Sequence, residues 1–135
     1  MPPAAADPWM IFHGGFYYYS ESRQKRQIYI RRSRTIAGIG EDPGVCVWTA
    51  PEQGGNCDNV WAPELHLIDG RWFIYYAADD GHNHNHRMWV LECHGSDPRD
   101  KYRCQGPLQT QGWAIDGTIM TINDGRKYFV WSGWP

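Results

Sequence analysis

Three acidic residues stand at similar places in the sequence, each a few residues ahead of one copy of a repeated phrase. They are Asp7, Glu64 and Asp116. Carboxylates that face one another across a partly desolvated pocket move one another's pKa values apart, so one stays ionised as a base while another stays protonated as an acid. Glycoside hydrolysis uses such a pair. The alternative is that the three carboxylates cap strands by accepting hydrogen bonds from backbone N–H groups.

The repeated phrase consists of a turn followed by a run of aromatic residues. A glycine of the phrase falls at positions 15, 70 and 125, so consecutive copies are 55 residues apart. The pairs Gly14-Gly15, Asp69-Gly70 and Asp124-Gly125 are predicted to form two-residue hairpin turns, because glycine accepts the positive φ that such turns require. A regular repeat that returns a carboxylate to one place would gather carboxylates around an axis.

Almost no segment of the chain has the pattern of a helix. Short segments rich in Tyr, Ile, Val, Trp and Phe, bounded by Gly, Asp, Asn and Pro, predict β-strands instead. The predicted strands are Trp9–Phe12, Phe16–Ser20, Gln27–Ser33, Val45–Thr49, Glu64–Ile68, Trp72–Ala77, Arg87–Glu92, Tyr102–Leu108, Thr118–Ile122 and Tyr128–Ser132.

Four strands in each repeat of about 50 residues are typical of a β-propeller blade. The sequence therefore predicts an all-β, incomplete propeller domain over residues 1–135, with four-stranded antiparallel blades. Blade 1 is expected at about 6–60, blade 2 at about 61–112 and the start of blade 3 at about 113–135. Because the first strand of a blade lines the central channel, each acidic residue is expected to begin an innermost strand. A β-sandwich with chance repetition is the competing architecture.

About two and a half blades cannot close into a ring, and they leave sheet edges unpaired. We therefore expect the isolated chain to be unstable or to self-associate through its open edges, unless further sequence follows Pro135. The first residues, Met1 to Ala6, contain neither the basic nor the apolar segment of a signal peptide.

The composition favours a sugar as the partner over a nucleic acid or a membrane. The net charge is −2, and no cluster of Lys and Arg forms the basic patch that nucleic-acid binding needs. No apolar run approaches the roughly 18 residues needed to span a bilayer. Aromatic residues make up 15% of the chain, including 8 Trp and 8 Tyr. They suit broad sheets, and their faces also pack against the C–H face of a sugar ring.

Two further groups of residues leave alternatives open. Of the four cysteines, Cys93 and Cys104 flank a short polar loop and are the pair most suited to a disulfide in an oxidising compartment, while free buried cysteines are the alternative. His82, His84 and His86 alternate with asparagine, and in an extended segment they would project from one side toward zinc or copper. A polar loop between two strands explains them better, so we expect neither a metal nor a cofactor.

Several segments together resemble glycoside hydrolase family 43, and more closely its fungal and bacterial arabinofuranosidases. The segments are Ala6–Trp9, Val60–His66 and Trp113–Thr118, strengthened by Asp69–Ala78 and by Trp131–Pro135. The resemblance covers essentially the whole chain. It implies a propeller of five blades and an inverting enzyme with three essential carboxylates.

The resemblance also implies a role for each acidic residue. Asp7 would be the general base that activates water, and Asp116 would tune the pKa of the general acid and orient it. The general acid would be a Glu on a later blade, in a region that this sequence does not reach. In the family pattern, the residue that corresponds to Glu64 follows the Trp-Ala-Pro motif and is not the proton donor. Glu64 is instead expected to bind substrate, together with Trp9 and Trp61.

The sequence as a whole is thus interpreted as part of a secreted, extracellular glycosidase. It would hydrolyse terminal α-L-arabinofuranosyl, or β-xylosyl, linkages of plant cell-wall polysaccharide with inversion. The alternative is a catalytically inactive fragment, or a sugar-binding propeller, that lacks the general acid. We expect the 135-residue chain alone to be inactive.

Overall fold

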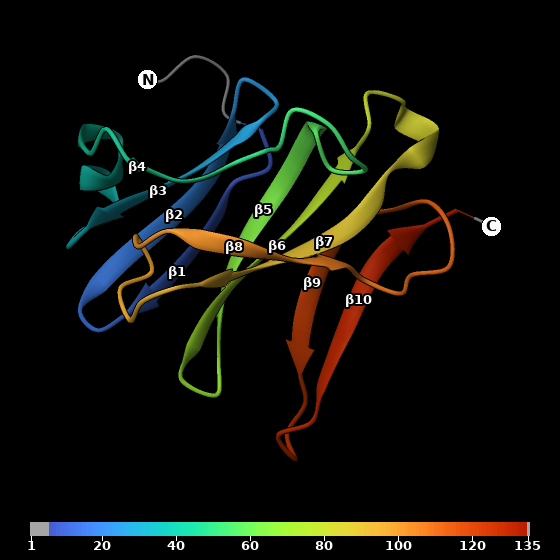
Figure 1. Ribbon diagram of the computed structural model, residues 1–135. Helices are drawn as coiled ribbons and strands as arrows, with labels where there is room; N and C mark the ends of the chain where they lie inside the picture. The colour runs from blue at the N-terminus through green and yellow to red at the C-terminus, as the bar shows by residue number, and fades with distance from the viewer. Residues whose placement is uncertain (1–5, 135) are drawn as a thin grey trace.

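The protein is described by a computed structural model covering residues 6–134, which form ten strands and two short 3₁₀ helices (Figure 1). The strands are β1 (Trp9–His13), β2 (Phe16–Arg23), β3 (Gln27–Ser33), β4 (Val45–Thr49), β5 (Asp58–Ile68), β6 (Arg71–Asp79), β7 (Arg87–Cys93), β8 (Tyr102–Pro107), β9 (Ala114–Thr121) and β10 (Lys127–Gly133). The helices are η1 (Ala37–Glu41) and η2 (Asn83–Asn85). Within residues 6–134 no helix is long and apolar enough to cross a membrane.

The strands form three antiparallel sheets in which each strand pairs with its neighbours in sequence. Two sheets have four strands, β1-β2-β3-β4 and β5-β6-β7-β8, and the third pairs β9 with β10. β5 contacts β1 and β2 of the first sheet, and β9 contacts β5, β6 and β7 of the second. The predicted all-β fold, with two four-stranded antiparallel blades and the start of a third, is confirmed.

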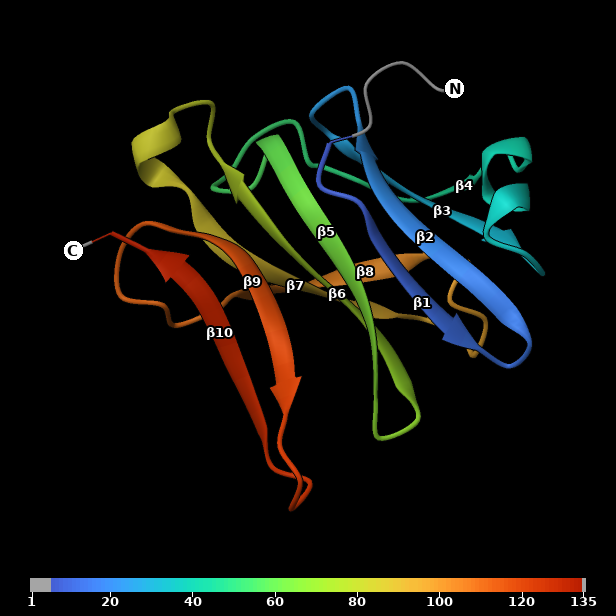
Figure 2. The same cartoon turned by 180° about the vertical axis from the view of Figure 1, so that it is seen from behind.

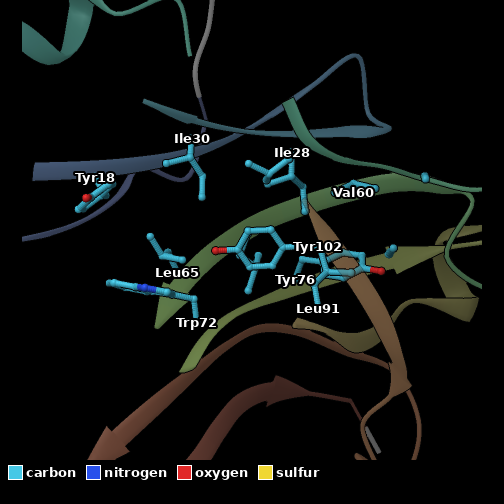
Figure 3. Close-up of a cluster of buried hydrophobic side chains, with 13 residues drawn as sticks. Tyr18, Ile28, Ile30, Val60, Leu65, Trp72, Tyr76, Leu91 and Tyr102 are labelled. Carbon is cyan, nitrogen blue, oxygen red and sulfur yellow. The ribbon is translucent and has the colours of Figure 1, made fainter. Parts of the chain in front are cut away.

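The main hydrophobic core fills the space between the first two sheets. Tyr18, Ile28 and Ile30 enter it from the first sheet, and Leu65 and Trp72 enter it from the second (Figure 3). Burial alternates along these strands because successive side chains point to opposite faces of a sheet. Each large apolar side chain that becomes fully buried contributes about 1.5–3 kcal/mol. The core therefore fixes β1 against β5.

A smaller cluster holds the third sheet against the second. Ala77, Met88 and Ala114 are fully buried there, and Phe129 packs against them. β9 is in this way fixed beside β5, as β1 is on the other side. Figure 2 shows β1, β5 and β9 running in the same general direction across the molecule.

Two of the three predicted hairpin turns have the expected form. Gly14 and Gly15 have φ values of 58° and 84°, and Asp69 and Gly70 have values of 50° and 76°. Positive φ at both central residues is the signature of a type I′ turn. These turns set the registers in which His13 pairs with Phe16, and Ile68 with Arg71.

The third predicted two-residue turn is wrong. β9 ends at Thr121 and β10 begins at Lys127, and the Gly125 N–H donates to the carbonyl of Ile122 at 2.9 Å. Gly125 has a φ of 86°, whereas Asp124 is not in the left-handed region. The extra residue Asn123 makes this a longer turn in which a single glycine follows two ordinary turn residues.

β5 and β9 begin earlier than predicted, at Asp58 in place of Glu64 and at Ala114 in place of Thr118. Both strands contain a shift of pairing register. The shift interrupts the alternation of residues that marks a strand in the sequence, but the strands continue to pair beyond it. Glu64 therefore lies inside β5, and the expectation that it begins an innermost strand is wrong.

The proposed disulfide between Cys93 and Cys104 is absent, and all four cysteines are free and half-buried. Cys93 lies opposite Tyr102 across the β7–β8 pair, and Cys104 lies opposite Leu91. The two thiols are therefore offset along the strands and do not face each other. The alternative of free, partly buried cysteines holds.

Candidate active site

The site begins with a β-bulge in β5. Trp61 pairs with Ala77 and Glu64 pairs with Tyr75, so three steps along β5 match two steps along β6. The extra residue is accommodated at Ala62, whose φ is 45°. Such a bulge bends a strand and redirects its side chains.

β9 contains the same bulge. Ile115 pairs with Ser132 and Thr118 pairs with Val130, which is again three steps against two. Asp116 occupies the bulged position with a φ of 53°. In the first blade Asp7, just before β1, also has a φ of 53°. Asp7 and Asp116 therefore share the same left-handed φ, and Ala62 takes the corresponding place in the second blade.

Glu64 lies two residues beyond the bulge position. Its pairing with Tyr75 corresponds to the pairing of Trp9 with Ser20 in the first blade, 55 residues earlier in each strand. The three acidic residues are therefore not equivalent. Asp116 lies in the β9 bulge and Asp7 lies just before β1, both with a left-handed φ, whereas Glu64 projects from a regular strand position.

All three carboxylates nevertheless line one pocket of about 190 Å³. Its lining residues are Asp7, Pro8, Trp9, Ala62, Glu64 and Asp116. The residues come from the start of β1 and the segment just before it, from β5 at and just beyond its bulge, and from the bulge of β9. The fold thus brings together the acidic residues that the sequence selected, and Trp9 with them.

The carboxylates influence one another's ionisation. The pKa of Asp116 is raised, first by burial and then by the charges of Asp7 and Glu64, while His86 acts in the opposite direction. Asp7 and Asp116 are both largely exposed, whereas Glu64 is half-buried. Close carboxylates that resist simultaneous ionisation are the electrostatic condition for acid–base chemistry.

Glu64 and Trp9 are held in place by their neighbours. Glu64 Oε2 lies 2.9 Å from Nε2 of His66. The Trp9 indole N–H donates to the carbonyl of Leu65 at 2.9 Å, and its ring centre lies 4.9 Å from that of His66. These contacts present the Trp9 ring as a fixed wall of the pocket.

Trp61 is not among the residues that line this pocket. Its ring stacks on the imidazole of His86, with the ring centres 4.0 Å apart. His86 is fully buried, and its Nε2 donates to the carbonyl of Asn59 at 3.0 Å. Its Nδ1 lies 2.9 Å from a carboxylate oxygen of the equally buried Asp79. Burial lowers the pKa of His86, although the Asp79 charge opposes that change.

His86 therefore supports the bulge of β5 from behind. Its carbonyl also accepts the N–H of Ala114 at 3.2 Å, which ties it to the start of β9. The sequence pattern groups His86 with His82 and His84, as a metal ligand or as part of a polar loop, and does not predict this role. Its sole signal was a position directly before a strand, which does not distinguish a buried imidazole from an exposed one.

The three alternating histidines do not form an extended ladder. Residues Asn83–Asn85 form the η2 helix, so His82 and His84 lie on the surface while His86 turns inward. The premise that the histidines project from one side is wrong. Within residues 6–134 no group of three or more His, Cys, Asp or Glu side chains could hold a metal ion.

Comparison with known proteins identifies the family of this fold and site. The model of the glycosyl hydrolases family 43 matches residues 1–135. The chain belongs to glycosyl hydrolase family 43. This confirms the resemblance found in the motifs around Asp7, Glu64 and Asp116.

Curated and solved relatives include several arabinofuranosidases. The chain is 36% identical to alpha-L-arabinofuranosidase 43 of Humicola insolens, over 94% of its own length. Over the same share of its length it is 32% identical to an extracellular exo-alpha-(1->5)-L-arabinofuranosidase of Streptomyces chartreusis. The crystal structure of an alpha-L-arabinofuranosidase from Lactobacillus brevis matches 94% of the chain with a TM-score of 0.86 and 34% identity.

The chain spans only part of these relatives: 27% of the Humicola protein, 40% of the Streptomyces protein and 43% of the Lactobacillus structure. Family 43 enzymes are five-bladed β-propellers, and the chain contains two blades and the start of a third. The partial coverage agrees with this number of blades.

Proposed function

We propose that the protein acts as an inverting glycosidase that removes terminal α-L-arabinofuranosyl units from plant cell-wall polysaccharide. The observation that carries the proposal is the pocket lined by Asp7, Glu64 and Asp116. The names of the relatives support the arabinofuranosyl unit, and β-xylosyl units are the second choice. Two Streptomyces relatives are named extracellular, which supports secretion.

Asp7 is suited to the role of general base. Its carboxylate is exposed at the pocket, so a water molecule can reach it. The base removes a proton from this water as the water attacks the anomeric carbon on the face opposite the leaving group. An inverting site needs roughly 6.5–9.5 Å between base and acid to admit that water.

The acid in this proposal is a Glu outside these 135 residues. A carboxyl group entering a pocket that already holds Asp116 and Glu64 meets two like charges, which raise its pKa. It would keep its proton until it protonates the leaving oxygen. Asp116 thereby acts on the acid and not on the water, while Trp9 and Glu64 contact the sugar.

The test is turnover of an aryl α-L-arabinofuranoside by a protein that carries this chain together with the remaining blades. Asp7→Asn should lower kcat by about 10³-fold or more, because it removes the base but leaves the shape of the pocket unchanged. Asp69→Asn is the matched control, since Asp69 lies in a hairpin turn away from the pocket. Near-normal turnover by Asp7→Asn would remove Asp7 from the base role.

The inactive alternative is tested in the same assay. The 135-residue chain alone should show negligible turnover, because it lacks the proposed acid. Turnover comparable to that of the longer protein would contradict an acid outside the chain. Sugar binding without any cleavage by the longer protein would favour the sugar-binding propeller. The anomer first released, observed by NMR, tests inversion.

A further inference from the structure

Three polar residues form a buried group beside the acidic pocket, and none of them lines it. Asp79 and His86 are fully buried, and Asn59 is half-buried. They come from three segments: Asn59 lies near the start of β5, Asp79 ends β6, and His86 follows the η2 helix. Charged and polar groups are costly to bury unless they are paired. We call these residues the Asn59–Asp79–His86 unit.

Hydrogen bonds join the three members of the unit. The side-chain amide of Asn59 donates to both carboxylate oxygens of Asp79, at 3.0 and 3.1 Å. The carbonyl of Asn59 accepts the Nε2–H of His86 at 3.0 Å. The N–H of Gly81 also donates to Asp79, at 2.8 Å. The unit is therefore held together by bonds between distant parts of the chain and not by a single turn.

The unit contacts both of the bulged strands that carry the acidic pocket. The His86 ring stacks on Trp61, which is the neighbour of the bulged residue Ala62 in β5. The His86 carbonyl accepts the N–H of Ala114 at 3.2 Å, two residues ahead of Asp116 in β9. A change at His86 therefore acts on the bulge of β5 and on the start of β9 together.

The two ring nitrogens of His86 have different surroundings. Nε2 donates to a carbonyl, which can only accept, so Nε2 carries a proton whether or not the ring is charged. Nδ1 lies 2.9 Å from the Asp79 carboxylate, so a second proton on Nδ1 meets a negative charge. The other charged groups around His86 are Asp116 and the guanidinium of Arg87, which donates to the His86 carbonyl at 2.8 Å. The ring can thus become charged inside the protein.

We propose that His86 is a positioning residue of the acidic pocket, which fixes Asp116 through the start of β9 and places beside it a ring that can become charged. This inference rests on the proposed function, because the acidic pocket is taken as the catalytic one. Burial lowers the pKa of His86, so the ring becomes charged in acid. Burial, Asp7 and Glu64 raise the pKa of Asp116, and the His86 charge acts against that rise. Asp116 therefore stays ionised to lower pH.

The test uses a protein that carries this chain with the remaining blades. His86→Gln keeps a donor for the Asn59 carbonyl but cannot become charged. It should lower kcat/KM for an aryl α-L-arabinofuranoside about threefold to tenfold more at pH 4 than at pH 7, because a protonated Asp116 cannot tune the acid. The carboxyl signal of Asp116 in carbon NMR should titrate at higher pH than in the unchanged protein. His84→Gln is the matched control and should alter neither result, because His84 is exposed on η2.

Asp79→Asn separates this role from a purely structural one. Each single change, Asp79→Asn or His86→Gln, leaves one buried group without its charged partner and should lower the melting temperature. The double change removes both charges, so it should recover much of the stability and still show the larger loss at pH 4. Recovery of the normal pH dependence along with the stability would overturn the inference. A His86→Gln loss of equal size at pH 4 and pH 7 would also overturn it.

The NMR titration distinguishes a failure of this inference from a failure of the proposed function. If the unchanged protein cleaves no arabinoside but His86→Gln still moves the Asp116 titration to higher pH, the proposed function fails and the role of His86 remains. If the unchanged protein cleaves arabinosides and the Asp116 titration does not move, the proposed function stands and the inference about His86 is wrong.

Discussion

The bulges of β5 and β9 have the same backbone and different side chains. Each has three residues opposite two, and the bulged residue has a φ of 45° in β5 and 53° in β9. β5 carries Ala62 at that residue, and β9 carries Asp116. The repeat therefore copies a backbone shape from blade to blade, and the carboxylate is a separate feature of each copy.

The position of Glu64 follows the same logic. It takes the regular strand position that Trp9 occupies in the first blade and Thr118 occupies in the third. The longer Glu side chain reaches the pocket from two residues further along the strand. The second blade thus supplies a carboxylate with a different approach and a different partner, His66.

The left-handed backbone at these bulges constrains which residues are suitable. Aspartate and asparagine adopt this conformation more readily than other residues with a side chain. Alanine has no such preference for it. Strain of about 1–3 kcal/mol is typical of such positions and persists only where the surroundings enforce it. The buried His86 and the pairing of β5 with β6 enforce it at Ala62.

Among changes to the two bulges, the largest expected effect comes from making the β9 bulge identical to the β5 bulge. Asp116→Ala should fold normally, because Ala62 already occupies the same backbone in β5. It should lower kcat/KM for an aryl α-L-arabinofuranoside by about 10²–10³-fold in the protein with its remaining blades, if Asp116 tunes the acid as we propose.

Glu64→Gln is the comparison for that measurement. It keeps the size of the side chain and removes only the charge, so we expect a loss of less than about tenfold. Equal losses in the two variants would mean that the bulge position and the strand position contribute alike. That result would contradict the difference between the two blades.

A second prediction concerns the residue that follows each bulge. β5 has Pro63 there, fully buried, whereas β9 has Gly117. A Cβ atom on Gly117 would overlap the Phe129 ring and lie 2.7 Å from the Met88 methyl group. Gly117→Ala should therefore destabilise the protein by about 1–3 kcal/mol in chemical denaturation, the usual range for overpacking.

Gly40→Ala is the matched control for Gly117→Ala. Gly40 lies in η1, and a Cβ atom there would meet no other atom within 4 Å. It should change stability by less than about 0.5 kcal/mol. If Gly117→Ala were equally neutral, the third sheet would pack on the second more loosely than the contacts of Phe129 and Met88 indicate.

Much of the fold was predictable because its signals are local. Glycine with a partner that accepts positive φ marked the turns at residues 14–15 and 69–70, and aromatic and β-branched runs marked the strands. The third turn was missed because Asn123 lengthens the turn and changes its type, while the Asp124-Gly125 pair that marks a two-residue turn is still present. The bulges were missed because neither Ala62 nor Asp116 is a glycine, and the preference of aspartate for the left-handed conformation is too weak to mark such a residue inside a strand.

The acidic residues and Trp9 that line the pocket could be selected from the sequence, but the arrangement of these residues could not. Asp7 and Asp116 share a motif position, and the structure gives them the same backbone. Glu64 also stands a few residues ahead of a copy of the repeated phrase, but its pairing with β6 places it two residues beyond the bulge position. The support by His86 and Asp79 depends on contacts between distant segments, which no spacing along the chain encodes.

The smallest expected effect is on stability and follows from the raised pKa of Asp116. A carboxyl group whose pKa is higher in the folded than in the unfolded protein binds more protons in the folded state. The folded state therefore loses stability as pH rises through the interval between the two pKa values. The interval begins at the ordinary value of 3.8 and ends at the raised value. Asp116→Asn should therefore stabilise the protein at pH 7 and have no effect near pH 3. The gain should stay below about 1 kcal/mol because solvent screens this exposed group.

Thermal unfolding of Asp116→Asn at pH 3 and pH 7 measures this gain, with Asp69→Asn as the control for removing a charge outside the pocket. Ala62 allows carboxylate repulsion to be separated from backbone strain, because β5 has the same bulge without a carboxylate. Ala62→Asp would add a charge next to Glu64 and Asp116, so the double change Ala62→Asp with Asp116→Asn should lose the stabilisation at pH 7. A gain at pH 7 that survives in the double change would mean that Asp116→Asn relieves backbone strain at the bulge and not repulsion among carboxylates.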